Sequence, residues 1–283
     1  MTKREDGANP VVQIIVTRTL QTGGAALLAL AGLRAVLPPE RFRPLIPAGG
    51  LLVAGGLSAY FVATFTPRTP LGGVPLVCRL PKRADRAVAL TFDDGPHPET
   101  TPRLLDILAA HDAHATFFLV GERAARFPDL VRAIADAGHA LGIHGLRHEA
   151  MVLQSASRAA ADLRAARRIL VDTAGLPDPA AVRLFRPPYG FKTAALCRAA
   201  ARLGLVTVAW SCDPRDYDLV NANALRARVA ARLRPGDIVL LHERPDAPHT
   251  LDALPGVLAD IAGRGLKSVA LPADGFGERD GAG

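Results

Sequence analysis

The sequence predicts an α/β fold in which parallel strands close, or nearly close, into a barrel. Between Arg86 and Pro272, short apolar runs alternate with longer helical segments rich in Ala, Arg and Leu. This alternation is typical of parallel strands joined by crossover helices. Polar residues of catalytic type follow the apolar runs, as they do at the C-terminal ends of barrel strands. Of the 283 residues, 49% are hydrophobic, which is enough for one sizeable core.

An N-terminal region, residues 1–66, is predicted to anchor the chain in a membrane. Residues 45–66 contain no charged residue over 22 positions, enough for roughly 33 Å of helix. Residues 12–33, interrupted by Arg18, are a second candidate span but could instead be an interfacial helix or a signal-like segment. The alternative for residues 45–66 is a buried core helix of a soluble domain. The number of spans, one or two, stays open.

Arginines just before residues 45–66 predict the orientation of this anchor. The positive-inside rule places Arg34, Arg41 and Arg43 in the cytoplasm, so the chain that follows would face outward. We therefore expect a cell-membrane location with the catalytic domain on the extracytoplasmic side. Residues 67–86, rich in Pro and Gly, are expected to form a linker to a domain at 87–272.

The expected strands and helices of that domain alternate along the chain. The strands cover residues 87–92, 115–120, 140–143, 182–185, 205–210, 238–241 and 268–271. The helices cover roughly residues 99–111, 122–137, 155–174, 191–203, 221–233 and 249–263. Short apolar runs bounded by turn residues are typical of buried strands. Residues 273–283, rich in Gly and charge, are expected to be a disordered tail.

The net charge of +7 restricts the class of partner. Arginines are scattered through the helical segments without a basic-aromatic stripe, which argues against nucleic-acid binding. A solvated surface, or attraction to an anionic membrane or wall polymer, explains the charge better. Cys78, Cys197 and Cys212 show no zinc-ligand spacing and allow at most one disulfide.

Two adjacent carboxylates, Asp93 and Asp94, follow the first predicted strand in the run Thr-Phe-Asp-Asp-Gly-Pro. Two anions this close must be held by a cation or share a proton, because like charges raise each other's pKa. Asp-Asp-Gly-Pro is also good turn chemistry. The pair alone therefore leaves an ordinary surface turn open.

The later strands each end in further polar residues. His144 and His148 follow the third strand; two imidazoles four residues apart can face one centre from a helical turn, and a carboxylate would complete a metal-ligand set. Arg186, at the start of a loop stiffened by two prolines, brings a permanent cation toward the carboxylates. Residues 210–217 follow the fifth strand, and His242 the sixth. Their gathering at one end of consecutive strands predicts a single site.

These runs, TFDDGP, HGLRH, RPPYG, DPRDY and LLH in chain order, resemble the five motifs of the polysaccharide deacetylases. This family is also called carbohydrate esterase family 4 or the NodB homology domain. The resemblance covers about residues 86–272 and none of the N-terminal segments. It implies a distorted (β/α)7-type barrel that uses a divalent metal to hydrolyse N-acetyl, sometimes O-acetyl, groups on amino-sugar glycans such as peptidoglycan or chitin-type oligosaccharides. Two alternatives stay open: a deacylase or deformylase of a lipid-linked amino sugar, and a catalytically weak glycan-binding envelope protein.

The resemblance also implies roles for the residues around the acidic pair. Asp93 would be the general base, oriented by Arg186. Asp94, His144 and His148 would bind the metal, with zinc first and cobalt or another divalent ion as alternatives. Gly145 departs from the Ser or Thr of many relatives, but that hydroxyl is not a ligand.

The remaining implied roles concern proton donation and substrate contact. His242 would be the general acid, and Asp216 would tune its pKa. The backbone N–H of Tyr189 would help to hold the oxyanion, and Leu240 would wall the pocket for the acetyl methyl group. Trp210 and Tyr217 would contact substrate, and Tyr217 stands where Trp is common.

Overall fold

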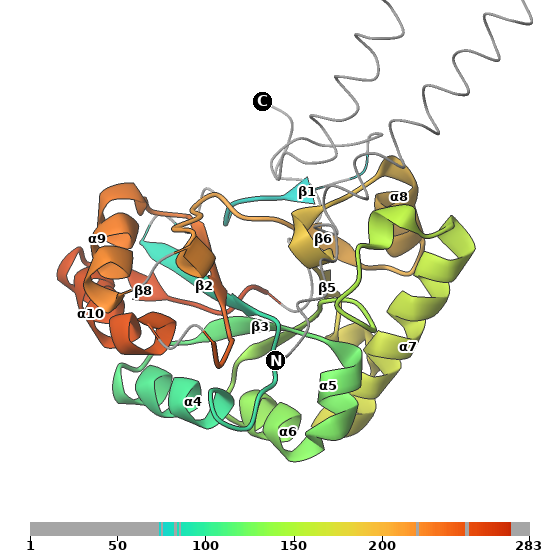
Figure 1. Cartoon of the computed structure of the whole chain (residues 1–283), viewed down its shortest axis with the longest axis horizontal. Helices are drawn as coiled ribbons and strands as arrows, with labels where there is room; N and C mark the ends of the chain where they lie inside the picture. Colours follow the sequence, from blue (N-terminus) through green and yellow to red (C-terminus); the bar gives the residue numbers. More distant parts are fainter. Residues whose placement is uncertain are drawn as a thin grey trace, which may run out of the picture. The chain divides into compact units, whose positions relative to one another are not determined.

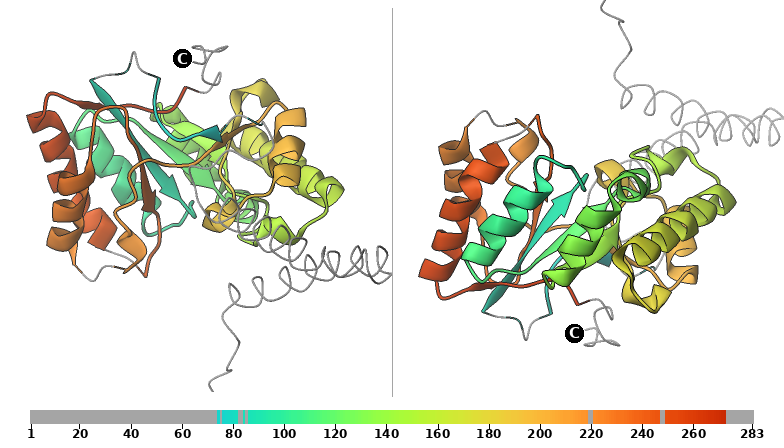
Figure 2. Two further views of the ribbon diagram at one scale, coloured as in Figure 1. Left: turned by 90° about the horizontal axis from the view of Figure 1, so that it is seen from above. Right: turned by 90° about the horizontal axis from the view of Figure 1, so that it is seen from below.

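The computed structural model describes residues 74, 76–81, 84, 86–218, 221–246 and 249–272. They form a curved parallel sheet with helices packed around its outer side (Figure 1). Figure 2 shows the same arrangement from above and from below. The two predicted membrane spans lie outside the described residues. No helix within the described ranges is both long and apolar enough to cross a membrane.

The main path of the sheet has the strand order β1-β6-β5-β4-β3-β2-β7. Its strands are β1 (Leu76–Val77), β2 (Ala87–Asp93), β3 (Ala115–Leu119), β4 (Ala140–Ile143), β5 (Leu184–Phe185), β6 (Val206–Val208) and β7 (Ile238–His242), and β8 (Lys267–Ser268) pairs with β2 beside this path. Every pairing between these strands is parallel. The parallel α/β architecture expected from the sequence is therefore confirmed.

The sheet comes close to closing between β6 and β7. The amides of Ser211 and Cys212 donate to the carbonyl of Ile238 at 3.0 and 3.1 Å, and the amide of Leu240 donates to the carbonyl of Cys212 at 2.9 Å. The chain just after β6 thus bonds to β7 without forming a full strand. An isolated parallel bridge between Cys212 and Val239 is thus the contact that nearly closes the sheet.

Seven α-helices in the described ranges cover the sheet: α4 (Thr101–Ala110), α5 (Gly121–Arg126), α6 (Pro128–Asp136), α7 (Ala156–Ala174), α8 (Ala194–Arg202), α9 (Ala222–Arg232) and α10 (His249–Gly263). The side chains of Ser155, Thr193 and Asn221 cap the N-termini of α7, α8 and α9. The single helix expected over 122–137 is wrong. Pro128 begins α6, and because a residue before proline avoids the helical region, the chain breaks at Phe127.

The expected linker, residues 67–86, is structured in part. β1 pairs with β6, and Arg79 forms an ion pair with Asp237 at 2.6 Å. Leu80 is buried. The strands expected over 182–185 and 268–271 are shorter, at Leu184–Phe185 and Lys267–Ser268. The 3-10 helix Pro179–Ala181 runs up to Val182 and leaves only the end of that run for β5.

Side chains of β2 point alternately to the two faces of the sheet, and this alternation determines that Asp93 points into the barrel. Leu90 and Phe92 belong to the large core between sheet and helices, whereas Ala89 belongs to the smaller cluster inside the barrel. Because successive strand residues point to opposite faces, Thr91 and Asp93 share the inner face with Ala89. The first acid of the pair therefore points into the barrel at its C-terminal end.

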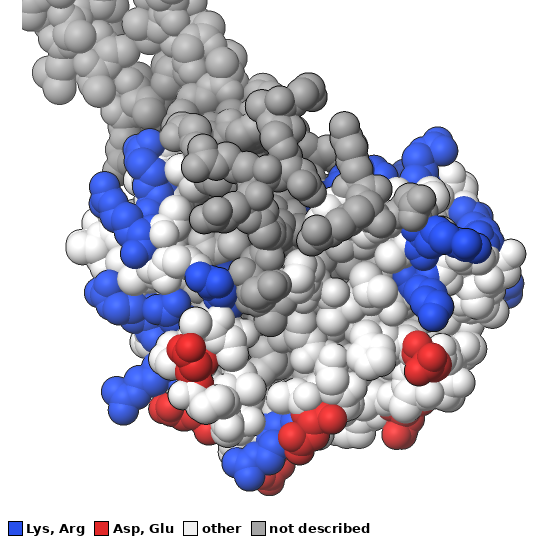
Figure 3. All heavy atoms as spheres, turned by 180° about the vertical axis from the view of Figure 1, so that it is seen from behind, with Lys and Arg blue, Asp and Glu red and all other residues white. Residues whose placement is uncertain are grey.

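Charged side chains are dispersed on the face turned away in Figure 1. In Figure 3, Lys and Arg occur as separate groups around the periphery, with Asp and Glu between them and along the lower edge. On the visible, described part of this face they form no continuous basic stripe.

Candidate active site

The pairing of β2 with β7 places two functional side chains side by side. Asp93 ends β2 and His242 ends β7, and the two are direct register partners in the parallel ladder. Asp94 follows in a left-handed conformation with φ of 75°. This turn gives the second carboxylate a different direction from the first.

Asp93 is bound to a buried cation. Its Oδ1 accepts a hydrogen bond from Nη1 of Arg186 at 2.7 Å, and both side chains are almost fully buried. Arg186 also donates to Oγ1 of Thr91 at 2.8 Å and to the carbonyl of Ala209 at 3.0 Å. Its guanidinium lies 4.1 Å from the ring centroid of Phe118. Such a fixed fork holds Asp93 in one orientation.

Asp94 faces the two histidines. Its Oδ1 lies 2.9 Å from Nε2 of His148 and 3.5 Å from Nε2 of His144. One ligand atom from each of the three residues lies within 4.8 Å of the others. Burial opposes ionisation of Asp94, but the two imidazoles hold the pKa of its carboxyl well below the usual range.

These three residues fit a divalent cation. Nδ1 of His144 lies 2.9 Å from the carbonyl of Arg186, which can only accept, so Nδ1 carries a proton and, in the neutral ring, Nε2 is the nitrogen that can bind a metal ion. Oδ1 of Asp94 is buried and accepts no well-directed hydrogen bond from the described residues. Acceptor atoms that face one another are stabilised by a cation bound between them. One carboxylate with two imidazoles is a common ligand set for a divalent metal ion.

The spacing of the histidines is achieved by a loop. Residues 144–150 are not helical, so the expected helical turn is wrong. Gly145 has φ of +81°, and a Cβ there would lie 2.8 Å from the carbonyl oxygen of Arg147. A side chain at this position would strain the backbone, so glycine suits this loop.

His242 is held by Asp216. Nδ1 of His242 lies 2.7 Å from Oδ1 of Asp216, and the backbone N–H of His242 donates to Oδ2 at 2.7 Å. Thr250 donates to the same Oδ2 at 3.1 Å. Burial lowers the pKa of His242, but the negative charges of Asp216 and, to a smaller extent, Asp93 and Asp94 outweigh burial and raise this pKa to about 9. The imidazole is therefore cationic at neutral pH, with Nδ1 engaged and Nε2 on the opposite side of the ring.

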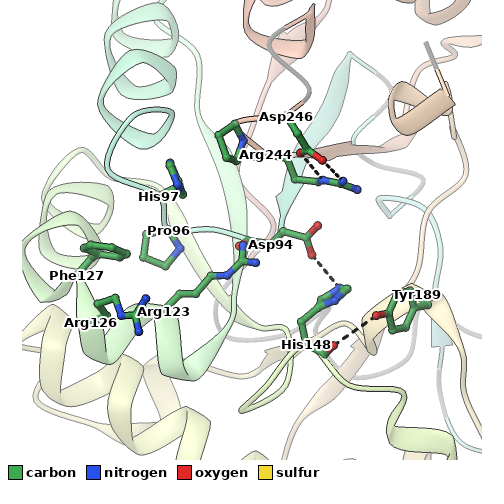
Figure 4. A pocket seen from close by; sticks show the side chains of 11 residues that line it. Asp94, Pro96, His97, Arg123, Arg126, Phe127, His148, Tyr189, Arg244 and Asp246 are labelled. Atoms are coloured by element: carbon green, nitrogen blue, oxygen red, sulfur yellow. Dashed lines mark hydrogen bonds and ion pairs between the residues drawn. The ribbon is translucent and has the colours of Figure 1, made fainter. Parts of the chain in front are cut away.

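A cleft of about 560 Å³ opens over this site. Figure 4 shows Asp94 and His148 between two walls. The cleft is lined by Asp94, Pro96, His97, Arg123, Arg126, Phe127, His148, Tyr189, Arg244, Pro245 and Asp246. Tyr189 has φ of 62°, and its ring lies edge-on to His148 with centroids 4.6 Å apart.

The other residues expected to contact substrate lie farther from this cleft. Trp210 and Leu240 are buried in the cluster inside the barrel and do not belong to the cleft lining described above. Tyr217 is 45% exposed and lies edge-on to His242, with ring centroids 5.5 Å apart. Contact of Tyr217 with substrate beside His242 stays a prediction, as does the acetyl-methyl pocket at Leu240.

Sequence reasoning missed Thr91, Glu243 and the three cleft arginines. Thr91 could have been found from the alternation along β2, which places it on the same face as Asp93. Glu243 directly follows His242, and its fully buried carboxylate accepts hydrogen bonds from Thr100 and Thr101. No local signal separates the cleft arginines from the many others in the chain.

Comparison with known proteins identifies the family. The family profile described as polysaccharide deacetylase matches residues 81–208. A peptidoglycan-N-acetylglucosamine deacetylase of Bacillus cereus is 35% identical over 187 residues, which is 65% of this chain and 66% of that protein. A chitooligosaccharide deacetylase of Azorhizobium caulinodans is 34% identical over 192 residues, which is 67% of this chain and 90% of that protein.

Solved structures agree with this assignment. The crystal structure of the Bc1960 peptidoglycan N-acetylglucosamine deacetylase matches with a TM-score of 0.66 and 32% identity, covering 71% of this chain and 92% of that one. A second match, with a TM-score of 0.64 and 27% identity over 70% of this chain and 68% of that one, is a family 4 carbohydrate esterase pseudoenzyme from Bacillus anthracis. With these matches and the motif residues gathered at the strand ends, the chain belongs to the polysaccharide deacetylase family, carbohydrate esterase family 4.

Proposed function

We propose that this protein is a metal-dependent hydrolase that removes N-acetyl groups from amino-sugar glycans of the peptidoglycan or chitin type. One observation carries the proposal. Asp93, held by Arg186, and His242, held by Asp216, are register partners beside the cluster of Asp94, His144 and His148. The relatives are peptidoglycan and chitooligosaccharide deacetylases, which supports the same substrate class.

Asp94, His144 and His148 would hold the divalent metal, and we propose zinc. When bound, a divalent cation supplies Lewis-acid chemistry: it polarises the amide carbonyl and lowers the pKa of a coordinated water. Nδ1 of His144 is bonded to the carbonyl of Arg186, so the ring is oriented with Nε2 toward the ligand cluster. The protein thus presents ligands already arranged for the ion.

Asp93 acts as the general base. Arg186 occupies its Oδ1 and leaves Oδ2 for the attacking water. Because Arg186 is also fixed by Thr91 and Ala209, the base is held in place before substrate binds. Preorganisation of this kind removes the cost of orienting the carboxylate during the reaction.

His242 acts as the general acid. An amine is a poor leaving group and must receive a proton as the C–N bond breaks. The pKa of about 9 keeps His242 protonated at neutral pH, and its contact with Asp216 through Nδ1 leaves Nε2 to donate. The backbone N–H of Tyr189, on the cleft wall, would stabilise the developing oxyanion.

The proposal includes a membrane anchor with the catalytic domain on the extracytoplasmic side. Its support is the uncharged run at residues 45–66 and the arginines that precede it. Partition of the full chain into the soluble fraction without detergent would contradict it.

One assay tests the activity. The full chain, purified in detergent and loaded with zinc or cobalt, is incubated with acetylated chitooligosaccharides, peptidoglycan fragments and a lipid-linked amino sugar, and released acetate and formate are measured. We expect acetate from at least one of the first two substrates, and none from chelator-treated protein. Formate or other acyl release from the lipid-linked sugar alone would favour the deacylase or deformylase alternative. Release from no substrate by fully metal-loaded protein would favour the catalytically weak glycan-binding alternative; one relative of known structure is a family 4 carbohydrate esterase pseudoenzyme.

A further inference from the structure

The cleft has more positive charge than the proposed reaction uses. Its lining includes three guanidinium groups, from Arg123, Arg126 and Arg244, and two carboxylates, from Asp94 and Asp246. Asp94 is engaged by the histidines, and Asp246 is paired with Arg244. The two carboxylates are therefore already committed, and a metal ion would add further positive charge.

The two arginines on α5 form no ion pair with a carboxylate among the described residues. Arg123 donates to the backbone carbonyl of Asp94, and its charge also acts on the buried carboxyl of Glu243. Arg126 is exposed, and none of the ion pairs found between described residues includes it. The acid of the same helix, Glu122, is bound to Arg147 at 2.6 Å.

The two arginines repel each other, although both lie in the last turn of α5, where the helix dipole favours cations. Arg123 and Arg126 are three residues apart, so they are neighbours on one helix surface, and like charges at this spacing repel by about 0.2–0.5 kcal/mol. No hydrogen bond or ion pair found between described residues joins Arg126 to Asp93, His242 or the metal ligands. An anion bound between them would relieve the repulsion.

The walls of the cleft suit such an anion beside the reacting sugar. In Figure 4, Arg123 and Arg126 lie on one side of Asp94, with Phe127 next to Arg126 and His97 beyond Pro96, and Arg244 lies on the other side. A guanidinium fork matches the oxygens of a carboxylate or phosphate in two parallel hydrogen bonds. Aromatic rings beside it provide a surface for a sugar ring.

We propose that Arg126, with Arg123, binds a carboxylate or phosphate carried by the glycan next to the acetylated sugar. The preferred substrate is then an acidic amino-sugar glycan and not a neutral one. This inference rests on the proposed function and narrows it. It assigns Arg126 to substrate selection, apart from the groups that carry out hydrolysis.

The test compares three oligomers of equal length. One is a neutral N-acetylglucosamine oligomer, one alternates N-acetylglucosamine with N-acetylmuramic acid bearing a free carboxylate, and one is the neutral oligomer with a terminal phosphate. The metal-loaded full chain is assayed for acetate release as wild type, Arg126→Gln and Arg164→Gln. Arg164 is an exposed arginine of α7 outside the cleft lining, so its replacement controls for loss of charge.

We expect wild-type kcat/KM on at least one anionic oligomer to exceed that on the neutral oligomer about tenfold. Arg126→Gln should remove most of this advantage by raising KM about five- to tenfold, with kcat unchanged, because the contact is equal in ground and transition states. The neutral oligomer and the Arg164→Gln variant should be unaffected, and added salt should reduce the preference. The group that Arg126 binds, carboxylate or phosphate, is identified by which anionic oligomer loses its higher kcat/KM in Arg126→Gln. Equal efficiency on all three oligomers, or the same loss on neutral and anionic oligomers in Arg126→Gln, would overturn the inference.

A binding measurement separates this inference from the proposed function. Calorimetry on metal-loaded Asp93→Asn, with and without Arg126→Gln, gives Kd for each oligomer without turnover. Tighter binding of an anionic oligomer that depends on Arg126 supports the subsite even if no acetate is released. Equal Kd values for charged and neutral oligomers refute the subsite even if hydrolysis is observed.

Discussion

The ion pair between Asp216 and His242 offers a quantitative test of the proposed acid. Asp216 is buried and contacts both the ring and the backbone of His242. In Asp216→Asn the shape is retained but the negative charge is lost. Without that charge, the pKa-lowering effect of burial is no longer offset by Asp216, so the pKa of the imidazole should fall from about 9 to near its ordinary value of 6.5.

The size of the effect follows from this difference. A fall from about 9 to 6.5 corresponds to roughly 3 kcal/mol of lost stabilisation of the imidazolium. At pH 7.5 the protonated fraction would drop from nearly all to about one tenth, which predicts a loss of about tenfold in kcat/KM from protonation alone. Because the folded pKa of His242 is raised, this pair stabilises the fold fully below pH 6.5, and the stabilisation is lost as pH rises through about 9.

The assay is the pH profile of kcat/KM for wild type and Asp216→Asn, with an NMR titration of the His242 ring. The alkaline limb of the variant should lie about 2.5 pH units lower, and the ratio of wild-type to variant activity should rise from pH 6 to pH 9. Asp218→Asn is the matched control, since Asp218 is exposed on the same 3-10 helix. A constant ratio across this range, with an unmoved alkaline limb, would refute the assignment of His242 as the acid.

Two further predictions concern stability. Burial raises the pKa of Glu243 from 4.5 to about 7, so ionisation of this carboxyl should lower the free energy of unfolding by roughly 3 kcal/mol as the pH rises between these values. Glu243→Gln should therefore be more stable than wild type at pH 8 in denaturant titrations. Equal stability of the two proteins would contradict this prediction. A Cβ at Gly190 would overlap the Trp210 ring at φ of +68°, so Gly190→Ala should cost about 2–4 kcal/mol. At Gly175, with φ of +66° and nothing within 4 Å, alanine should cost only about 1 kcal/mol, and similar losses at both sites would argue against the overlap.

Much of the fold could be predicted because its signals are local. The runs at 115–120 and 140–143 are mostly apolar, and they form β3 (Ala115–Leu119) and β4 (Ala140–Ile143) much as expected. The site could be predicted because parallel strands bring their C-terminal ends to one edge. Asp93 and His242 are 149 positions apart in the chain and yet lie opposite each other in the ladder.

The features that the sequence did not predict depend on residues far apart in the chain or on the conformation of a single residue. β1 has only two residues, and its strand character depends on β6, far away in sequence. The loop that carries His144 and His148 is determined by the left-handed Gly145, not by helical spacing. Arg126 is a candidate for binding an anion only because it lines the cleft, and its place in the cleft cannot be read from the neighbouring sequence.

The central claim is that Asp93 and Asp94 perform different tasks despite being neighbours. The most direct test measures metal content and turnover together in Asp93→Asn and Asp94→Asn. We predict that Asp93→Asn keeps one equivalent of divalent metal per chain but loses nearly all acetate release, because Arg186 and not the metal holds this side chain. Asp94→Asn should lose metal affinity at least about tenfold, because it supplies the buried oxygen facing both histidines. Loss of metal from Asp93→Asn, or full turnover by that variant, would contradict the division of roles.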